Sequence, residues 1–217
     1  MRKCIILANG KPPRKSIIEF LMKKNYNTLI CADGGANSAR KLNLIPDFII
    51  GDLDSVSKST LNYFRGKSII HKIGRQNDTD VEKCLKFAIS IRISEAILTG
   101  VTGDRLDHTF CNLGIVLKFF NKIKLSIIAE DSYLSAYSGN IELKTLPGET
   151  ISLYGFNENT KIVSEGLKYP LKNIPLPFGV KESTSNVAVA SKVKLKITGG
   201  RIFIIRDFNK MKKNDLI

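Results

Sequence analysis

The chain has 217 residues, of which 43% are hydrophobic and 25% charged, a composition typical of a folded globular protein with one large or two small domains. It contains no apolar run of 18 residues, and its N-terminal apolar run spans five residues, so we expect neither a membrane helix nor a signal peptide. The expected location is therefore cytoplasmic. The formal net charge is +14, but the 34 Lys and Arg are dispersed along the chain, which argues against a specific nucleic-acid surface.

Cysteine spacing gives no sign of a metal site. The four cysteines are far apart, contain no C-x-x-C pair and lie in apolar patterns: Cys4, Cys31, Cys84 and Cys111. We expect buried free thiols rather than zinc ligands.

The first 129 residues alternate short Ile-rich runs with helical patterns. Strand-like runs cover residues 4–8, 28–32, 48–51, 68–72, 95–100 and 125–129. Helical spacing relates Val81, Cys84, Leu85 and Ala88, and also Leu106, Phe110, Leu113 and Leu117. Continuous apolar strands between helices predict an α/β domain with a doubly wound, mostly parallel sheet over residues 1–129.

From residue 130 onward the helical period gives way to alternating strands. Turns are predicted at Pro147-Gly148 and at Gly199-Gly200, within long stretches that alternate apolar and polar residues. Residues 130–217 are therefore predicted to form an antiparallel β-sandwich.

Seven of the eleven aspartates lie in four short segments between residues 33 and 107, each near a predicted strand end or helix start. The carboxyl ends of parallel strands meet at one sheet edge, so these acids are expected to converge there. Neighbouring carboxylates repel unless a cation lies between them, which predicts a divalent-metal site.

The segments CADGGAN and IIGDLDS supply the first acids. Asp33 precedes Gly34, whose backbone can approach a phosphate at a helix start, although a simple Asp cap explains the pattern equally well. Asp52 and Asp54 are two residues apart in an extended segment, so both can face one metal ion.

In QNDTDVEKCL, Asp78 or Thr79 can cap a helix that begins near Asp80, with Glu82 as a capping-box partner. That leaves Asp80 for a metal, and Gln76 for a phosphate or a base edge.

The segment TGDRLDH places Arg105 beside Asp104 and Asp107 at a helix start. Arg105 can bind phosphate oxygens, or it can simply pair with one of these acids. His108 is a further candidate acid, base or ligand, whereas His71 lies in a strand-like run and is expected to be packed. The clustered acids with Asp107 and His108 would also suit a metal-dependent phosphoesterase, and a basic nucleic-acid-binding module is the non-enzymatic alternative.

In the second half, GLKYPL (166–171) and STSN (183–186) interrupt the alternation. Tyr169 offers a ring for stacking on a flat heterocycle, and the hydroxyl and amide groups of STSN can bind ring nitrogens. Both segments can equally be surface turns.

Together, DGGAN, GDLDS, QNDTD, TGDRLDH, GLKYPL and STSN resemble, in the same order, the motifs of the thiamine pyrophosphokinase (thiamine diphosphokinase) family. The resemblance implies transfer of the pyrophosphoryl group of ATP to the hydroxyl of thiamine with Mg²⁺ as cofactor, in a homodimer whose active sites lie between subunits. It implies an ATP- and Mg²⁺-binding first domain and a thiamine-binding second domain.

By the same resemblance, each motif residue has an implied role. The metal ligands would be Asp52, Asp54 and Asp80, and the catalytic residues Asp54, Asp80, Arg105 and Asp107. ATP would contact Asp33, Gly34, Gln76, Thr79 and Arg105, and thiamine would contact Tyr169, Ser183, Ser185 and Asn186. Our own hypothesis, separate from the resemblance, is that Asp107 or an acid of the metal cluster orients or deprotonates the thiamine hydroxyl. Some relatives carry Trp where this chain has Tyr169.

Overall fold

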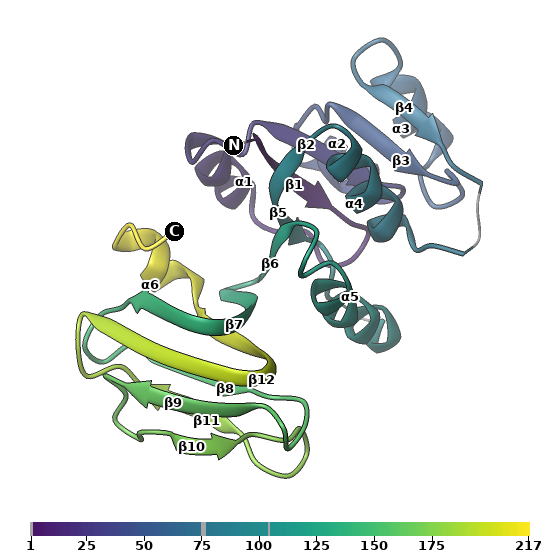
Figure 1. Cartoon of the computed structure of the whole chain (residues 1–217). Helices are drawn as coiled ribbons and strands as arrows, with labels where there is room; N and C mark the ends of the chain where they lie inside the picture. The colour runs from purple at the N-terminus through teal and green to yellow at the C-terminus, as the bar shows by residue number, and fades with distance from the viewer. Residues whose placement is uncertain (1, 75–76, 104) are drawn as a thin grey trace. The chain divides into compact units, whose positions relative to one another are not determined.

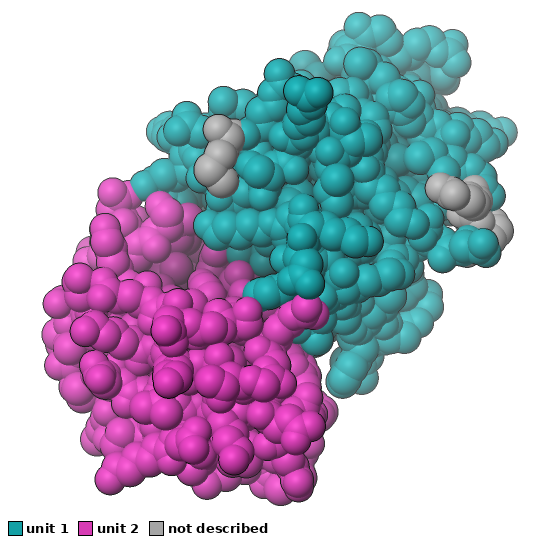
Figure 2. Space-filling view, in the orientation of Figure 1, with its two compact units in different colours: residues 1–129 teal, residues 130–217 magenta. Residues whose placement is uncertain are grey.

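The computed structural model describes residues 2–74, 77–103 and 105–217. The chain divides into two compact units, Met1–Ala129 and Glu130–Ile217, which Figure 2 shows in different colours. None of the helices in the described part of the chain combines the length and apolar character needed to cross a bilayer.

Unit 1 is built on a parallel sheet with the strand order β6-β5-β1-β2-β3-β4 (Figure 1). The strands are β1 (Arg2–Leu7), β2 (Thr28–Ala32), β3 (Phe48–Gly51), β4 (Ile69–Lys72), β5 (Ile93–Thr99) and β6 (Lys124–Ala129). The chain moves outward from β1 to β4 and then returns to the other side of β1 for β5. This reversal is the doubly wound arrangement that the sequence predicts, and it brings the carboxyl ends of the strands to one edge.

Five helices connect these strands: α1 (Lys15–Lys23), α2 (Gly35–Lys41), α3 (Lys58–Phe64), α4 (Asp80–Ser90) and α5 (Leu106–Lys118). The four apolar residues predicted for the α4 core face are all buried, and α4 packs against β1, β2, β3 and β5. The α5 pattern is a correction, because Leu106 and Phe110 are exposed whereas Ile115 and Val116 face the core. Spacing identified this helix but misplaced its buried face.

Two other expectations for unit 1 are wrong. His71 is exposed on the edge strand β4, although its ring still stacks on Phe48 at a centroid distance of 6.2 Å. Cys111 is exposed on α5, whereas the other three cysteines are buried as predicted.

Unit 2 is the predicted antiparallel β-sandwich. Its elements are β7 (Ser132–Lys144), β8 (Thr150–Tyr154), β9 (Lys161–Glu165), β10 (Lys172–Pro175), β11 (Ser183–Val187), β12 (Lys192–Asp207) and α6 (Phe208–Lys213). The first half of β12 pairs with β9 and the second half with β8, while β7 runs along both halves. β10 extends one sheet and β11 the other, around a core that includes Ile151, Ile162 and Val193.

The two predicted turns of unit 2 have different outcomes. The chain turns at Pro147-Gly148, where the Glu149 amide donates to the Leu146 carbonyl. At Gly199-Gly200 the chain does not reverse but continues as β12 through a break in register between Ile197 and Ile202. Because β7 offers a partner along nearly the whole of β12, these glycines form a bend between the two sheets instead of a hairpin.

Candidate functional site

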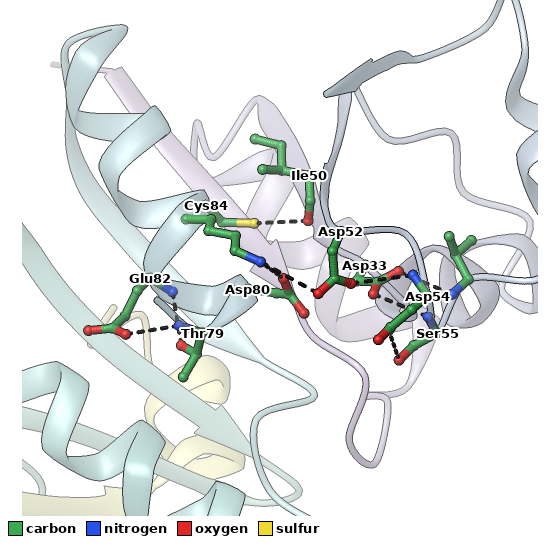
Figure 3. A network of polar contacts seen from close by, with 11 residues as sticks. Asp33, Ile50, Asp52, Asp54, Ser55, Thr79, Asp80, Glu82 and Cys84 are labelled. Atoms are coloured by element: carbon green, nitrogen blue, oxygen red, sulfur yellow. Dashed lines mark hydrogen bonds and ion pairs between the residues drawn. The ribbon is translucent and has the colours of Figure 1, made fainter. Parts of the chain in front are cut away.

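Three aspartates from separate segments meet at the carboxyl edge of the unit 1 sheet (Figure 3). Asp33 follows β2, Asp52 follows β3, and Asp80 is the first residue of α4. One carboxylate oxygen of each lies within 4.8 Å of the others. Oxygen ligands at this spacing suit a hard divalent cation such as Mg²⁺.

Asp33 is buried and holds the loop after β3. Its two carboxylate oxygens accept hydrogen bonds from the backbone N–H groups of Ser55, at 3.2 Å, and Val56, at 3.1 Å. The N-cap of α2 is Gly34, which has no side chain to cap with, so the alternative of a simple Asp cap is wrong. Asp33 has a φ of 41°, and this left-handed conformation turns the chain between β2 and α2.

The charge on Asp33 is unfavourable in the absence of a cation. Burial is the main cause that raises its pKa to about 6, and the neighbouring carboxylates of Asp54 and Asp80 raise it further. The N–H groups of Ser55 and Val56 oppose this shift. A cation between the acids would relieve the repulsion, which is the signature expected of a metal site.

Asp54 lies beside the three clustered acids instead of among them. It accepts a hydrogen bond from the Ser55 hydroxyl at 2.9 Å, and its backbone N–H donates to Asp52 at 3.3 Å. The Ser55 hydroxyl is the largest cause that lowers the pKa of Asp54, followed by a hydrogen bond with Asp33. Asp54 is thus an exposed, ionised carboxylate next to Asp33, outside the three-acid cluster but near enough to be an additional candidate metal ligand.

Lys83 is a member of this site that the sequence analysis missed. Its side chain is 4% exposed, and its Nζ lies 2.8 Å from Asp80 Oδ1 and 3.9 Å from Asp52 Oδ2. Burial opposes the ammonium charge, but the hydrogen bond to Asp80 and the nearby acids outweigh it and raise the pKa of Lys83. The available signal was its i+3 spacing from Asp80 on a predicted helix.

Gly51 gives the acids room to approach one another. A Cβ at this position would lie 2.7 Å from the Cβ of Asp33 and 3.2 Å from Oδ1 of Asp80. A side chain at the end of β3 would therefore push two of the three acids away, so glycine is required by the close approach.

The helix carrying Asp80 begins with the predicted capping box. Thr79 Oγ1 accepts from the Glu82 amide at 3.3 Å, and the Thr79 amide donates to Glu82 Oε2 at 3.0 Å. Asp78 instead pairs with Lys86, at 2.5 Å. The Thr79 hydroxyl therefore acts as an acceptor in the helix cap, and its proton can still be donated to a ligand. Gln76, which the sequence analysis also assigned to the ATP site, lies outside the described residues.

Arg105 and Asp107 form an exposed bidentate pair. Arg105 Nε donates to Asp107 Oδ1 at 2.9 Å, and Nη2 to Oδ2 at 2.5 Å. This hydrogen bonding is the main cause that lowers the pKa of Asp107 to about 2. Asp107 therefore stays charged and orients the guanidinium, whose remaining N–H groups can still bind an anion. His108 is exposed beside this pair, and Asp104 lies outside the described residues.

In unit 2 the structure brings together three of the four residues expected to bind a heterocycle. The Asn186 side chain donates to Ser183 Oγ at 3.0 Å and accepts from the Tyr169 amide at 3.1 Å. Tyr169 is 59% exposed, and Lys168 Nζ lies 5.5 Å from its ring centroid. The fourth residue, Ser185, is exposed, has a φ of 55° and donates its backbone N–H to Ser152 Oγ on the neighbouring strand β8 at 3.0 Å.

Two family models match this chain in tandem. "Thiamin pyrophosphokinase, catalytic domain" matches residues 21–128, and "Thiamin pyrophosphokinase, vitamin B1 binding domain" matches residues 140–202. Thiamin pyrophosphokinase 1 of Caenorhabditis elegans is 28% identical over 98% of this chain and 92% of its own length. Thiamine pyrophosphokinase of Bacillus subtilis is 24% identical over 95% of this chain and 99% of its own length.

Solved structures agree on the fold. The crystal structure of thiamine pyrophosphokinase from Bacillus subtilis superposes with a TM-score of 0.81 at 23% identity, covering 95% of this chain and 99% of that one. Yeast thiamin pyrophosphokinase superposes with a TM-score of 0.81 at 18% identity, covering 98% and 88%. These matches confirm the predicted α/β domain followed by a strand-rich domain.

Proposed function

The chain belongs to the thiamine pyrophosphokinase family and has thiamine diphosphokinase activity, and we propose that unit 1 supplies its ATP and Mg²⁺ site and unit 2 its thiamine site. The observation that carries this assignment is the convergence of Asp33, Asp52 and Asp80 within 4.8 Å at the carboxyl edge of the sheet. In open α/β sheets this edge is where ligands bind.

The residues present fit Mg²⁺. The cluster offers carboxylate oxygens, and Gly51 leaves the space that a Cβ would fill. Burial and the neighbouring carboxylates raise the pKa of Asp33, and a bound cation would favour its charged form. Asp52 and Asp80 would hold the ion, with Asp54 or Asp33 completing the set. Bound Mg²⁺ neutralises polyphosphate charge and favours in-line transfer to a hydroxyl.

The chain's own side chains divide the remaining tasks. Lys83 holds one oxygen of Asp80, which leaves the other to face the ligand site. Arg105 binds phosphate oxygens in the orientation that Asp107 imposes. Because the pKa of Asp107 is about 2, this carboxylate is a weak base. Proton removal from the thiamine hydroxyl is therefore better suited to an acid of the cluster than to Asp107.

The direct test combines purified protein, ATP, Mg²⁺ and thiamine and measures thiamine diphosphate and AMP. We expect both products in equal amounts, formed only when all four components are present. Asp52→Asn should lose at least about 100-fold in rate, because it removes a proposed metal ligand. Asp131→Asn, which changes an exposed aspartate of unit 2, is the matched control. Phosphate release without thiamine would instead indicate a hydrolase.

We further expect a homodimer and a cytoplasmic location. Unit 2 exposes several large apolar side chains besides the proposed thiamine site: Phe178, Val180 and Val189. Such side chains commonly pack against a second copy. Sedimentation velocity at several protein concentrations tests the dimer, and fractionation of cells tests the location.

A further inference from the structure

Asn186 on β11 is 2% exposed and makes four hydrogen bonds through its side-chain amide. Oδ1 accepts from the backbone N–H groups of Tyr169, at 3.1 Å, and Val187, at 2.8 Å. Nδ2 donates to the Tyr169 carbonyl at 2.8 Å and to Ser183 Oγ at 3.0 Å. Two N–H donors face the amide oxygen and two acceptors face the amide nitrogen, so the network itself fixes the amide orientation.

These four bonds use the full hydrogen-bonding capacity of the side chain. An Asn amide has two acceptor sites on oxygen and two donor hydrogens on nitrogen. Any direct bond from Asn186 to a ligand would require one of the four to break, and the group left behind would be buried and unpaired. The amide is therefore committed to the protein.

The backbone around Asn186 explains why its side chain takes this place. The register between β11 and β8 shifts between Ser183 and Asn186, and Ser185 has a φ of 55°. Farther along, Lys168 donates its backbone N–H to the Val187 carbonyl at 2.8 Å. Strand-like pairing thus ends at Tyr169, and the Asn186 amide binds both the N–H and the C=O of that residue as a neighbouring strand would.

We propose that Asn186 is a positioning residue that fixes the backbone of Tyr169, and that it does not contact thiamine itself. This role replaces the direct contact that the family resemblance implied. The side chains left for the heterocycle are the exposed ring of Tyr169 and the hydroxyl of Ser183, which accepts from Asn186 and keeps its own proton to donate. The inference rests on the proposed thiamine site.

A fluorescence reporter can separate the two roles, because the chain contains no tryptophan. Tyr169→Trp creates a single reporter at the position of interest. In this background, Asn186→Asp keeps the oxygen acceptors but removes both donors. We expect faster anisotropy decay of the tryptophan in the protein without thiamine, since a carboxylate beside the carbonyl of residue 169 would release the backbone. Asn157→Ala is the matched control, because it removes another asparagine that holds a loop of unit 2.

Thiamine binding gives the second readout. Ordering one backbone residue corresponds to about tenfold in affinity, so Asn186→Ala should raise the Kd for thiamine about tenfold and leave kcat at saturation nearly unchanged. In a Tyr169→Ala background, the same change should alter the Kd less than about twofold, because positioning has no ring left to act on.

Two results would overturn the proposal: full additivity of the Asn186 and Tyr169 changes in the Kd, or an unchanged anisotropy decay in Asn186→Asp. If the protein bound no thiamine at all, the proposed function would fail, yet the anisotropy measurement would still decide whether Asn186 holds residue 169. Thermal unfolding of each variant confirms that it is folded before either measurement.

Discussion

Replacing Gly51 by alanine tests whether the acidic cluster depends on close packing at the end of β3. The new Cβ would lie 2.7 Å from the Cβ and 3.2 Å from the Cα of Asp33. Gly51 has no positive φ, so alanine can adopt its backbone conformation and the perturbation is purely steric. The two close atoms are the Cα and Cβ of Asp33, and no side-chain rotation can move either of them away.

The size of the effect follows from these distances. An ordinary contact begins at 3.4 Å, so Asp33 and residue 51 must separate by about 0.7 Å beyond the 2.7 Å of the present geometry. The backbone N–H of Asp33 is bound to the Ile50 carbonyl at 2.9 Å, and its carboxylate to the loop after β3, so the shift disturbs the whole cluster. Forced overpacking of this kind costs about 1–3 kcal/mol of stability. Displacement of a positioned group by nearly 1 Å lowers catalysis by about 10- to 100-fold.

The assay is calorimetric titration of Mg²⁺ into the protein, together with the rate of thiamine diphosphate formation. Gly114→Ala on α5 is the control, because its Cβ would meet nothing within 4 Å. Alanine there should stabilise the helix by up to about 1 kcal/mol and leave Mg²⁺ binding unchanged. A folded Gly51→Ala protein with normal Mg²⁺ affinity and normal turnover would refute the reasoning.

Three further predictions concern stability. Without Mg²⁺, the free energy of unfolding should fall as pH rises from about 4 to 6, because the raised pKa of Asp33 means that the folded state binds its proton more tightly than the unfolded state does. The total decrease over this range should be at most about 3 kcal/mol. Urea unfolding in the presence of a chelator measures it, and the decrease should vanish in Asp33→Asn. Lys83→Met should destabilise the Mg²⁺-free protein by about 1–3 kcal/mol, because the Asp80 carboxylate loses its ion-pair partner. In thermal unfolding, added Mg²⁺ should restore part of the lost stability. An equal loss at all Mg²⁺ concentrations would contradict the prediction. Glu149→Gln should destabilise the protein by about 3–5 kcal/mol in urea unfolding, because the buried Arg206 guanidinium would lose its counter-charge and keep only neutral partners such as the Lys144 carbonyl. A loss below about 1 kcal/mol would show that water reaches this pair.

Much of the site could be predicted from local patterns. Strand runs bounded by turn residues, and helical spacing such as that of Val81 and Cys84, gave the order of the elements in unit 1. Because the carboxyl ends of parallel strands share one edge, that order alone predicted that acids after β2 and β3 would meet. The capping box of Thr79 and Glu82 was also readable, since both partners lie within one turn of chain.

The sequence by itself therefore determined the two-domain plan and the edge at which the acids gather, because these depend on residue periodicity and chain order. Only the tertiary structure decided which atoms meet. Asp33 joins Asp52 and Asp80 because Gly51 leaves space beside it, and Lys83 faces the cluster because α4 packs on the sheet with that side inward. Likewise, two of the four hydrogen bonds of the Asn186 side chain come from Tyr169, 17 residues away. Such distances depend on strand register and helix packing, which no local pattern records.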